Sequence, residues 1–288
     1  MDMEIAERLQ RARLSRIASD KKAQADNGGW VTASLLKSYT WNSSYNPLMD
    51  FSTALPSARS IKVPHVEQLC SWDCGLACVL MVLKTLGIEG HDLKSLGQLC
   101  CTSSIWTVDL AHLLRLFNIE VIFLTVTIGA NPNFAVETFY KENMEEDGER
   151  VNKLFEKAPE VGIQVQWRSI SAQELSKLIL SGKFLAIALV DKRKLCYPWL
   201  EDLCLSDCCG MMAGYTGHYI VICGYNVDLE EFEIRDPASS SEQGRISLQA
   251  LDEARKSFGT DEDLLLVSLE SSRKGARISS VVPEVHSN

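Results

Sequence analysis

The chain has 288 residues, of which 46% are hydrophobic, so it is long enough to bury a substantial core in one domain. Its formal net charge of −9 argues against nucleic acid or an anionic membrane as the main partner. The sequence contains no uninterrupted run of the roughly 20 apolar residues needed to span a bilayer. It also lacks the pattern of a secretory signal. We therefore expect a cytoplasmic protein, with a nuclear location as a further option. Its ten cysteines are expected to be thiols, a nucleophile or metal ligands rather than a disulfide framework.

Composition divides the chain into three parts. Residues 1–60 combine a short charged segment with a Ser-, Asn- and Thr-rich stretch, which predicts a partly disordered N-terminal appendage. Residues 61–271 carry the helix and strand patterns of one enzyme-like domain. Residues 272–288 are rich in Ser, Lys and Arg and predict a disordered tail.

The first strong element is an apolar run at residues 74–87. Its length and its apolar residues on nearly every face predict a buried central helix, with Asp73 as N-cap and Gly87 as a left-handed C-terminal stop. Cys74 then lies in the first turn, where free backbone N–H groups and the helix dipole favour a thiolate. Gln68 precedes Cys74 by six residues, so its side-chain amide can fold back beside the sulfur as an oxyanion donor.

Periodicity predicts further helices and strands along the domain. Apolar residues spaced three and four apart predict a helix after Trp106, and a capping-box pattern at Ser171 and Glu174 predicts another that ends at Gly182. The remaining predicted helices span residues 133–143, 149–158 and 247–258, and the predicted strands span residues 119–126, 163–167, 184–190, 219–223, 231–235 and 264–269. A helix-rich first half followed by a strand-rich second half indicates an α+β fold.

A second group of candidate site residues flanks the two predicted strands within residues 219–235. His218 opens the first of these strands, and Asp236 closes the second. In a hairpin, His218 and Asp236 would emerge at the same end of the sheet, where the carboxylate fixes the tautomer and the orientation of the imidazole. Together with Gln68 and Cys74, they predict a nucleophile, a base and an orienting group in one site.

The order of Gln68, Cys74 on a helix, His218 and Asp236 resembles papain-like cysteine peptidases. The bacteriocin-leader-processing branch is similar through its Asp-Cys-Gly-x-Ala, His-Tyr and Asp-Pro motifs. This resemblance implies an N-terminal central helix carrying Cys74 that packs on an antiparallel sheet carrying His218 and Asp236. It also implies a thiol hydrolase, either a peptidase or a deconjugase, that acts on a peptide or other acyl substrate and needs no cofactor.

A larger part of the chain, residues 61–271, resembles the plant guanylyl cyclase family. The resemblance is carried by Ser-Trp-Asp-Cys-Gly-Leu-Ala-Cys at 71–78 with the helix that follows, and by residues 104–110, 217–219, 235–238 and 257–263. It implies conversion of GTP to 3′,5′-cyclic GMP and pyrophosphate with Mg²⁺. The family's proposed centre falls on Ser71 for guanine binding, on Asp73 for base discrimination and on Lys84 for the transition-state charge.

Three functions therefore remain open. The first is a guanylyl cyclase, whose centre would have to extend along a helix that places Lys84 about 15 Å from Cys74. The second is a papain-like thiol hydrolase, in which Cys74 is expected to be the most reactive of the ten thiols. The third is an interaction module that keeps the same fold without catalysis.

Metal binding is a further open question. Four cysteines close in sequence could hold zinc, although none has Cys-x-x-Cys spacing: Cys196, Cys204, Cys208 and Cys209. Carboxylates are the other candidate metal ligands. Asp109 is expected to be an acid in the first turn of a helix, and the acidic residues 261–263 are expected to lie in a loop, rather than to bind a metal.

Overall fold

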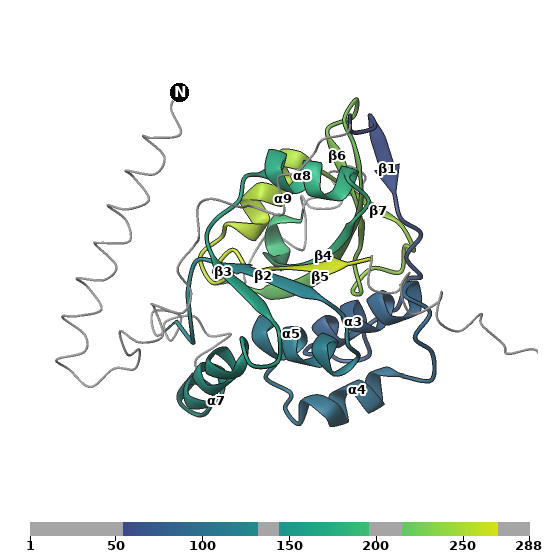
Figure 1. The fold of residues 1–288 in the computed structure, drawn as a ribbon. Helices are drawn as coiled ribbons and strands as arrows, with labels where there is room; N and C mark the ends of the chain where they lie inside the picture. The colour runs from purple at the N-terminus through teal and green to yellow at the C-terminus, as the bar shows by residue number, and fades with distance from the viewer. Residues whose placement is uncertain (1–53, 132–143, 196–214, 270–288) are drawn as a thin grey trace, which may run out of the picture. The chain divides into compact units, whose positions relative to one another are not determined.

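The computed structural model describes residues 54–131, 144–195 and 215–269 (Figure 1). These residues all fall in the second of two units into which the chain divides, Trp41–Asn288. The helices are α3 (Cys74–Thr85), α4 (Leu93–Cys100), α5 (Thr107–Leu116), α7 (Met144–Lys157), α8 (Ala172–Leu180), the 3-10 turn η2 (Lys192–Lys194) and α9 (Leu248–Arg255). The strands are β1 (Ala58–Ser60), β2 (Val121–Thr125), β3 (Gln164–Trp167), β4 (Phe184–Asp191), β5 (Gly217–Asn226), β6 (Glu231–Arg235), β7 (Gly244–Ser247) and β8 (Leu264–Ser268). No helix in these three segments is long and apolar enough to cross a membrane.

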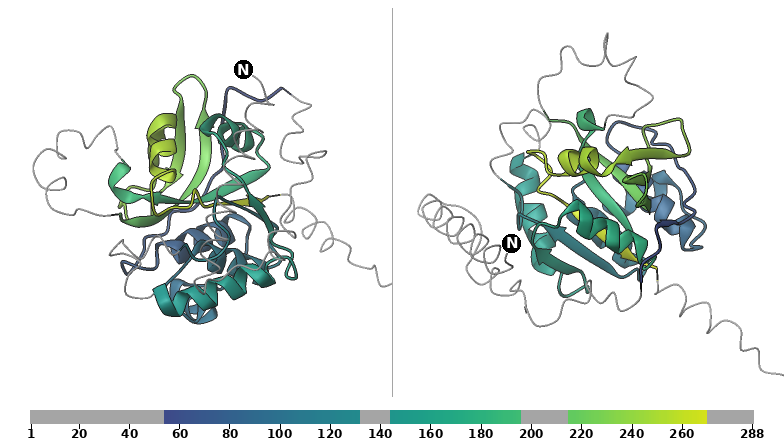
Figure 2. Two further views of the ribbon diagram at one scale, coloured as in Figure 1. Left: turned by 90° about the vertical axis from the view of Figure 1, so that its left-hand side faces the viewer. Right: turned by 90° about the horizontal axis from the view of Figure 1, so that it is seen from above.

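The strands form one mixed sheet in the order β3-β2-β8-β4-β5-β6-β7, with β1 paired to the end of β5. The neighbouring pairs are antiparallel except for β2 and β3. Helices α3, α4, α5 and α7 lie on one side of the sheet, and α8 and α9 lie on the other (Figures 1 and 2). The predicted α+β class is therefore confirmed.

Helix α3 is buried along most of its length, as its apolar sequence predicts. Every residue from Cys74 to Leu83 is buried, and the helix packs on β5 with α4 and α5 beside it. Gly87 follows the helix at a φ of +74°, and the N–H of Ile88 bonds to the carbonyl of Leu83 at 2.9 Å. This Schellman-type bond and the left-handed glycine confirm the predicted C-terminal stop.

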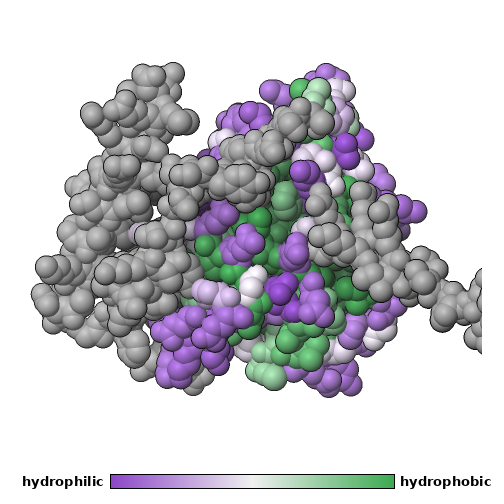
Figure 3. All heavy atoms as spheres, in the orientation of Figure 1, coloured by the Kyte–Doolittle hydropathy of each residue, from purple (hydrophilic) through white to green (hydrophobic). Residues whose placement is uncertain are grey.

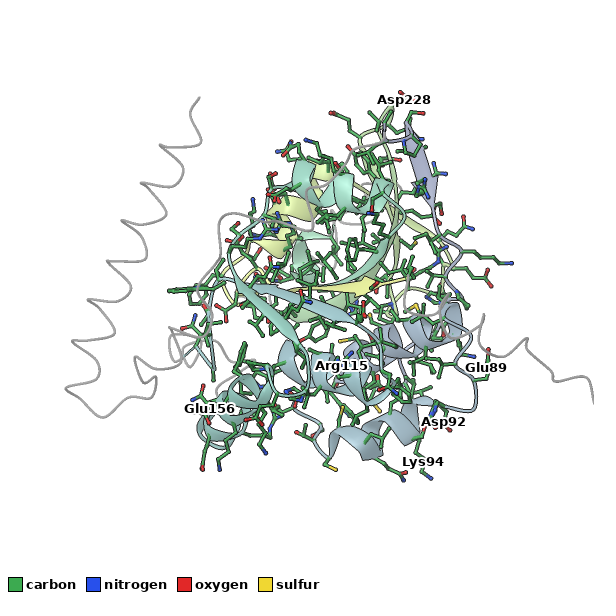
Figure 4. The ribbon with its side chains drawn as sticks, in the orientation of Figure 1. Glu89, Asp92, Lys94, Arg115, Glu156 and Asp228 are labelled. Atoms are coloured by element: carbon green, nitrogen blue, oxygen red, sulfur yellow. The ribbon has the colours of Figure 1, made fainter. Side chains whose placement is uncertain are left out.

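Strands β5 and β6 form the antiparallel hairpin that the sequence predicts, with Val221 paired to Arg235. His218 lies near the start of β5, and Asp236 follows the end of β6. Both residues therefore emerge at the open end of the hairpin. Asp228, in the turn that joins the two strands, lies at the opposite end (Figure 4).

Apolar side chains cover the central strands on both faces. On one face, α8 and α9 close a core that includes Ala186 of β4, Ile220 of β5 and Phe232 of β6. On the other face, α3 and α5 contribute fully buried residues such as Leu76 and Leu110. Burial on both faces explains why these strands are continuous apolar runs in the sequence.

The acidic motifs lie where a structural role predicts them. Asp109 is buried in the first turn of α5, accepts the N–H of Trp106 at 2.8 Å and forms an ion pair with Arg150 of α7. Arg150 also binds Asp147 at 2.8 Å, so these charges join α5 to α7, whose outer face is strongly hydrophilic (Figure 3). Asp261 lies in the turn that precedes β8.

Four described elements were not predicted: α4, the 3-10 turn η2, β1 and β7. Helix α4 begins with a reciprocal capping box between Asp92 and Ser95, but its eight residues are too few for an apolar period to be recognised in the sequence. Strand β1 pairs with β5, so the sheet already includes residues that composition assigned to the appendage. The rest of that appendage, the predicted helix at 133–143 and the predicted tail at 272–288 lie outside the described residues.

Candidate catalytic site

Cys74 is the first residue of α3, and its side chain is buried, with 5% of the residue exposed. The first helical hydrogen bond runs from the N–H of Ala77 to the carbonyl of Asp73 at 3.0 Å. The N–H groups of the first turn have no partner inside the helix, and the positive end of the helix dipole lies beside the sulfur. The predicted buried helix that carries Cys74 on the sheet is thus confirmed.

His218 joins the thiol to a carboxylate. Its Nε2 lies 2.6 Å from Oδ1 of Asp236, which also accepts the N–H of Ala238 at 2.8 Å, and the ring forms a further hydrogen bond with Cys74. Burial lowers the pKa of His218, but the hydrogen bonds with Asp236 and Cys74 outweigh burial and raise the pKa to about 9. His218 is therefore an imidazolium near neutral pH, with one ring nitrogen on the carboxylate and the other left for the thiol.

The loop before α3 is bonded to the segment that carries Asp236. The Nε2 atom of His65 lies 3.0 Å from the backbone carbonyl oxygen of Asp236, and the N–H of Gln68 bonds to the carbonyl of Pro237 at 2.9 Å. These bonds hold the loop that precedes Cys74 against the end of β6. Sequence reasoning gave His65 no role, because its partner is a backbone group far along the chain.

Asp73 directs its carboxylate into the loop rather than onto the helix. Its Oδ1 accepts the N–H of Cys70 at 3.0 Å and its Oδ2 that of Leu69 at 3.3 Å, and it makes no capping bond to α3. Its φ of −96° and ψ of 12° lie outside the extended conformation that aims an N-cap side chain at the first turn. The predicted position of Asp73 before the helix is correct, and its predicted side-chain cap is wrong.

Replacing Asp73 with Ala is expected to lower the free energy of unfolding by about 1–3 kcal/mol, because two loop N–H groups lose their acceptor. Asp73→Asn keeps one acceptor oxygen and is expected to lose less. Urea unfolding of the two variants beside the wild type measures both values. Equal losses for Ala and Asn would show that the carboxylate oxygens do not hold the loop.

Gln68 lies in the loop before Cys74, but its amide is turned toward the loop itself. Its Nε2 donates to the carbonyl of Cys70 at 2.7 Å, and its Oε1 is buried without a hydrogen-bond partner. One amide hydrogen remains for an oxyanion. The role of Gln68 as an oxyanion donor stays a prediction, as do the catalytic roles of Cys74, His218 and Asp236.

Of the residues expected from the cyclase resemblance, Lys84 lies far from Ser71 and Asp73. Ser71 is exposed in the loop, and the buried Asp73 binds loop amides. Lys84 is exposed in the last turn of α3, about 15 Å along the helix axis from Cys74. Their roles in binding GTP stay predictions.

The carboxylates of this site are already engaged. Asp73 accepts two loop N–H groups, and Asp236 accepts hydrogen bonds from His218 and Ala238. Within the part of the chain that the structure describes, no group of three or more His, Cys, Asp or Glu side chains could hold a metal ion. These residues therefore do not fit a Mg²⁺ ion held by paired carboxylates. The four cysteines considered for zinc lie outside that part: Cys196, Cys204, Cys208 and Cys209.

Known proteins resemble this chain in sequence and in structure. The sequence profile of a family described as guanylylate cyclase matches residues 63–267. Guanylyl cyclase 1 of Arabidopsis thaliana is 57% identical over 219 residues, which cover 76% of this chain and 80% of the relative. Among solved structures, a C39-like peptidase from Bacillus anthracis has a TM-score of 0.43 at 14% identity, covering 74% of this chain and 96% of its own. Xylellain, a cysteine protease from Xylella fastidiosa, has a TM-score of 0.39 at 12% identity, covering 78% of this chain and 90% of its own.

Proposed function

We propose that this chain, which belongs to the guanylylate cyclase family, acts as a thiol hydrolase. In its buried polar site the Cys74 thiol is hydrogen-bonded to the His218 imidazole, and this imidazole is hydrogen-bonded to the Asp236 carboxylate. The proposed substrate is a peptide, an isopeptide or another acyl compound, and no cofactor is required. The observation that carries the proposal is the hydrogen-bonded series of Cys74, His218 and Asp236 at the N-terminus of α3. We also propose a cytoplasmic or nuclear location, which the six free thiols among the described cysteines support.

The three side chains divide the chemistry of acyl transfer between them. The Cys74 thiolate attacks the carbonyl carbon of the substrate, and His218 gives its proton to the leaving amine, so that a thioester remains. The neutral imidazole then takes a proton from water as the water oxygen attacks the thioester. The carboxylic acid product leaves, and the pair of thiolate and imidazolium is restored. Asp236 keeps the imidazole oriented through both steps.

The negative oxygen that forms in each step needs hydrogen-bond donors. The backbone N–H of Cys74 is suited to this, because it belongs to the first turn and has no partner inside the helix. Gln68 supplies the second donor through the amide hydrogen that it does not give to Cys70.

The acyl ester p-nitrophenyl acetate tests this chemistry without the natural substrate. We expect the full chain to release a burst of p-nitrophenolate, because the thioester forms faster than water hydrolyses it. Mass spectrometry should then find one acetyl group on Cys74. Cys74→Ala is expected to abolish the burst. Cys70→Ala, which removes an exposed thiol from the loop before α3, is expected to retain the burst. A wild type without a burst, or a burst that survives Cys74→Ala, would contradict the proposal.

A guanylyl cyclase is the second candidate, favoured by the 57% identity to Guanylyl cyclase 1. In this reaction the 3′ oxygen of GTP attacks the α-phosphorus, pyrophosphate leaves, and cyclic GMP is formed. Ser71 and Asp73 would contact guanine, and Lys84, the one basic residue of α3, would contact the phosphates. Because Asp73 and Asp236 already accept hydrogen bonds, Mg²⁺ would arrive bound to the phosphates of GTP.

Formation of cyclic GMP by the purified chain with GTP and Mg²⁺ tests the second candidate. If this segment is the cyclase centre, we expect Ser71→Ala and Lys84→Ala each to abolish the formation of cyclic GMP. Lys94→Ala is the matched control, because Lys94 is an exposed lysine on the neighbouring helix α4 (Figure 4). Activity that survives both substitutions would exclude the segment. A protein with neither activity would be the interaction module.

A further inference from the structure

Directly behind the thiol and the imidazole, α3 touches β5 through Gly75 and Tyr219. Gly75 follows Cys74 in the chain, and Tyr219 follows His218. A Cβ atom at Gly75 would lie 3.1 Å from Cδ2 of Tyr219 and 2.9 Å from Cδ1 of Leu110. The end of Leu110 could move aside, but the Tyr219 ring would have to shift by a few tenths of an ångström, so glycine favours the close approach of α3 to β5.

The ring of Tyr219 is anchored at its outer end. Its hydroxyl lies 3.0 Å from Oγ1 of Thr107, the first residue of α5, and both residues are buried. Thr107 also forms a hydrogen bond with the carboxyl of Asp263, which precedes β8. Burial raises the pKa of Asp263 well above its usual range, although the hydroxyls of Thr107 and Thr125 donate to its carboxylate and act in the opposite direction. The hydrogen-bonded side chains of Tyr219, Thr107 and Asp263 therefore link β5, α5 and the residue before β8.

The register of the sheet supports the same arrangement. Leu189 of β4 pairs with Tyr219, and its N–H bonds to the carbonyl of Asp263 at 3.1 Å. Tyr219 of β5, Leu189 of β4 and Asp263, the residue before β8, thus form one row, and paired residues in a sheet point to the same face. Because Tyr219 contacts Gly75, this row faces the helix that carries the nucleophile.

We propose that Tyr219 is a positioning residue that sets the separation between the Cys74 sulfur and the His218 ring. The contacts of Tyr219 described above are with Gly75 and Thr107, so its proposed role is to position the reacting groups rather than to react itself. Its ring holds Gly75 at a fixed distance from β5, and the bond to Thr107 keeps the ring from turning. This inference rests on the thiol chemistry proposed above, since the separation matters only if Cys74 and His218 act as a pair.

Two substitutions test the hydroxyl anchor. Tyr219→Phe keeps the ring, and Thr107→Val removes the partner hydroxyl at similar size. Because one hydrogen bond of restraint is lost, we expect each variant to slow iodoacetamide alkylation of Cys74 at about pH 6 by about two- to tenfold and to move the rate–pH profile upward. Tyr225→Phe is the matched control: Tyr225 is a buried tyrosine of the same strand that packs on Phe232, and its loss should leave the profile as in the wild type.

Thermal unfolding of each variant separates a loss of fold from a loss of positioning, and either of the two hydroxyl variants suffices if the other does not fold. The inference alone is overturned if alkylation of the wild type depends on His218 but Tyr219→Phe and Thr107→Val behave like Tyr225→Phe. If His218→Ala leaves the wild-type profile unchanged, the thiol chemistry is overturned and this inference with it.

Discussion

Iodoacetamide at about pH 6 will modify Cys74 ahead of the other cysteines, and the preference will disappear in His218→Ala. An ordinary thiol with a pKa near 8.5 is less than about 1% ionised at this pH, whereas a thiol paired with an imidazolium reacts as the thiolate. We therefore expect Cys74 to react about 10- to 100-fold faster than the exposed Cys70. Mass spectrometry of the labelled peptides measures the order of reaction.

Exposure alone predicts the opposite order, which makes this result informative. Cys74 is 5% exposed, whereas Cys70 and Cys101 are exposed. Burial raises the pKa of Cys100 and of Cys223 to about 12, so these two thiols should remain unlabelled. Preference for Cys74 would thus report its chemistry rather than its accessibility.

The matched control for the labelling is His112→Ala. His112 bonds to the carbonyl of Leu154 on α7, so its loss should leave the labelling of Cys74 unchanged. The thiol hydrolase loses its main support if Cys74 of the wild type reacts no faster than Cys70 or the cysteines within residues 204–209.

Asp236→Asn will destabilise the protein most below about pH 6.5 and least above about pH 9. His218 has a pKa of about 9 in the folded protein against 6.5 for the free group. Its protonation therefore stabilises the fold fully below about pH 6.5, and this contribution is lost as the pH rises through about 9. The difference in pKa corresponds to about 3 kcal/mol at low pH. Without the carboxylate of Asp236, burial still lowers the pKa of His218 while its strongest raising interaction is gone, so we expect the variant to lose much of this stabilisation.

Urea unfolding of the wild type and Asp236→Asn over about pH 6 to 9.5 measures the effect. Asp92→Asn is the matched control, because hydrogen bonds with Ser95 lower the pKa of Asp92 and the group stays ionised over this range. Its difference from the wild type should therefore be constant. A constant difference for Asp236→Asn as well would show that Asp236 does not hold the charge on His218.

The parts of the fold that were predictable have local signals. The helix that carries Cys74 is an unbroken apolar run that ends where Gly87 takes the left-handed conformation. His218 and Asp236 are 18 residues apart and flank two strands short enough to form a hairpin, so their meeting followed from the sequence pattern alone.

The features that were missed depend on tertiary contacts or on backbone angles. The contact of Tyr219 with Gly75 and Thr107 joins three elements, and none of these residues has a neighbour in sequence that signals it. The direction of the Asp73 side chain depends on backbone angles that its residue type does not determine. Helix α4 escaped prediction because its eight residues are fewer than the window over which an apolar period can be recognised.

The long stretch of chain between the thiol and its partners has a consequence for biosynthesis. His218 and Asp236 come together within one hairpin, whereas Cys74 is made roughly 160 residues before Asp236. At typical translation rates that stretch takes about 8 to 30 s to synthesise. During that interval the thiol has neither its base nor the strand against which its helix packs, so we expect it to be no more reactive than any other cysteine. The growing chain is thereby protected from its own nucleophile, and reactivity begins only once the closing hairpin has left the ribosome and docked.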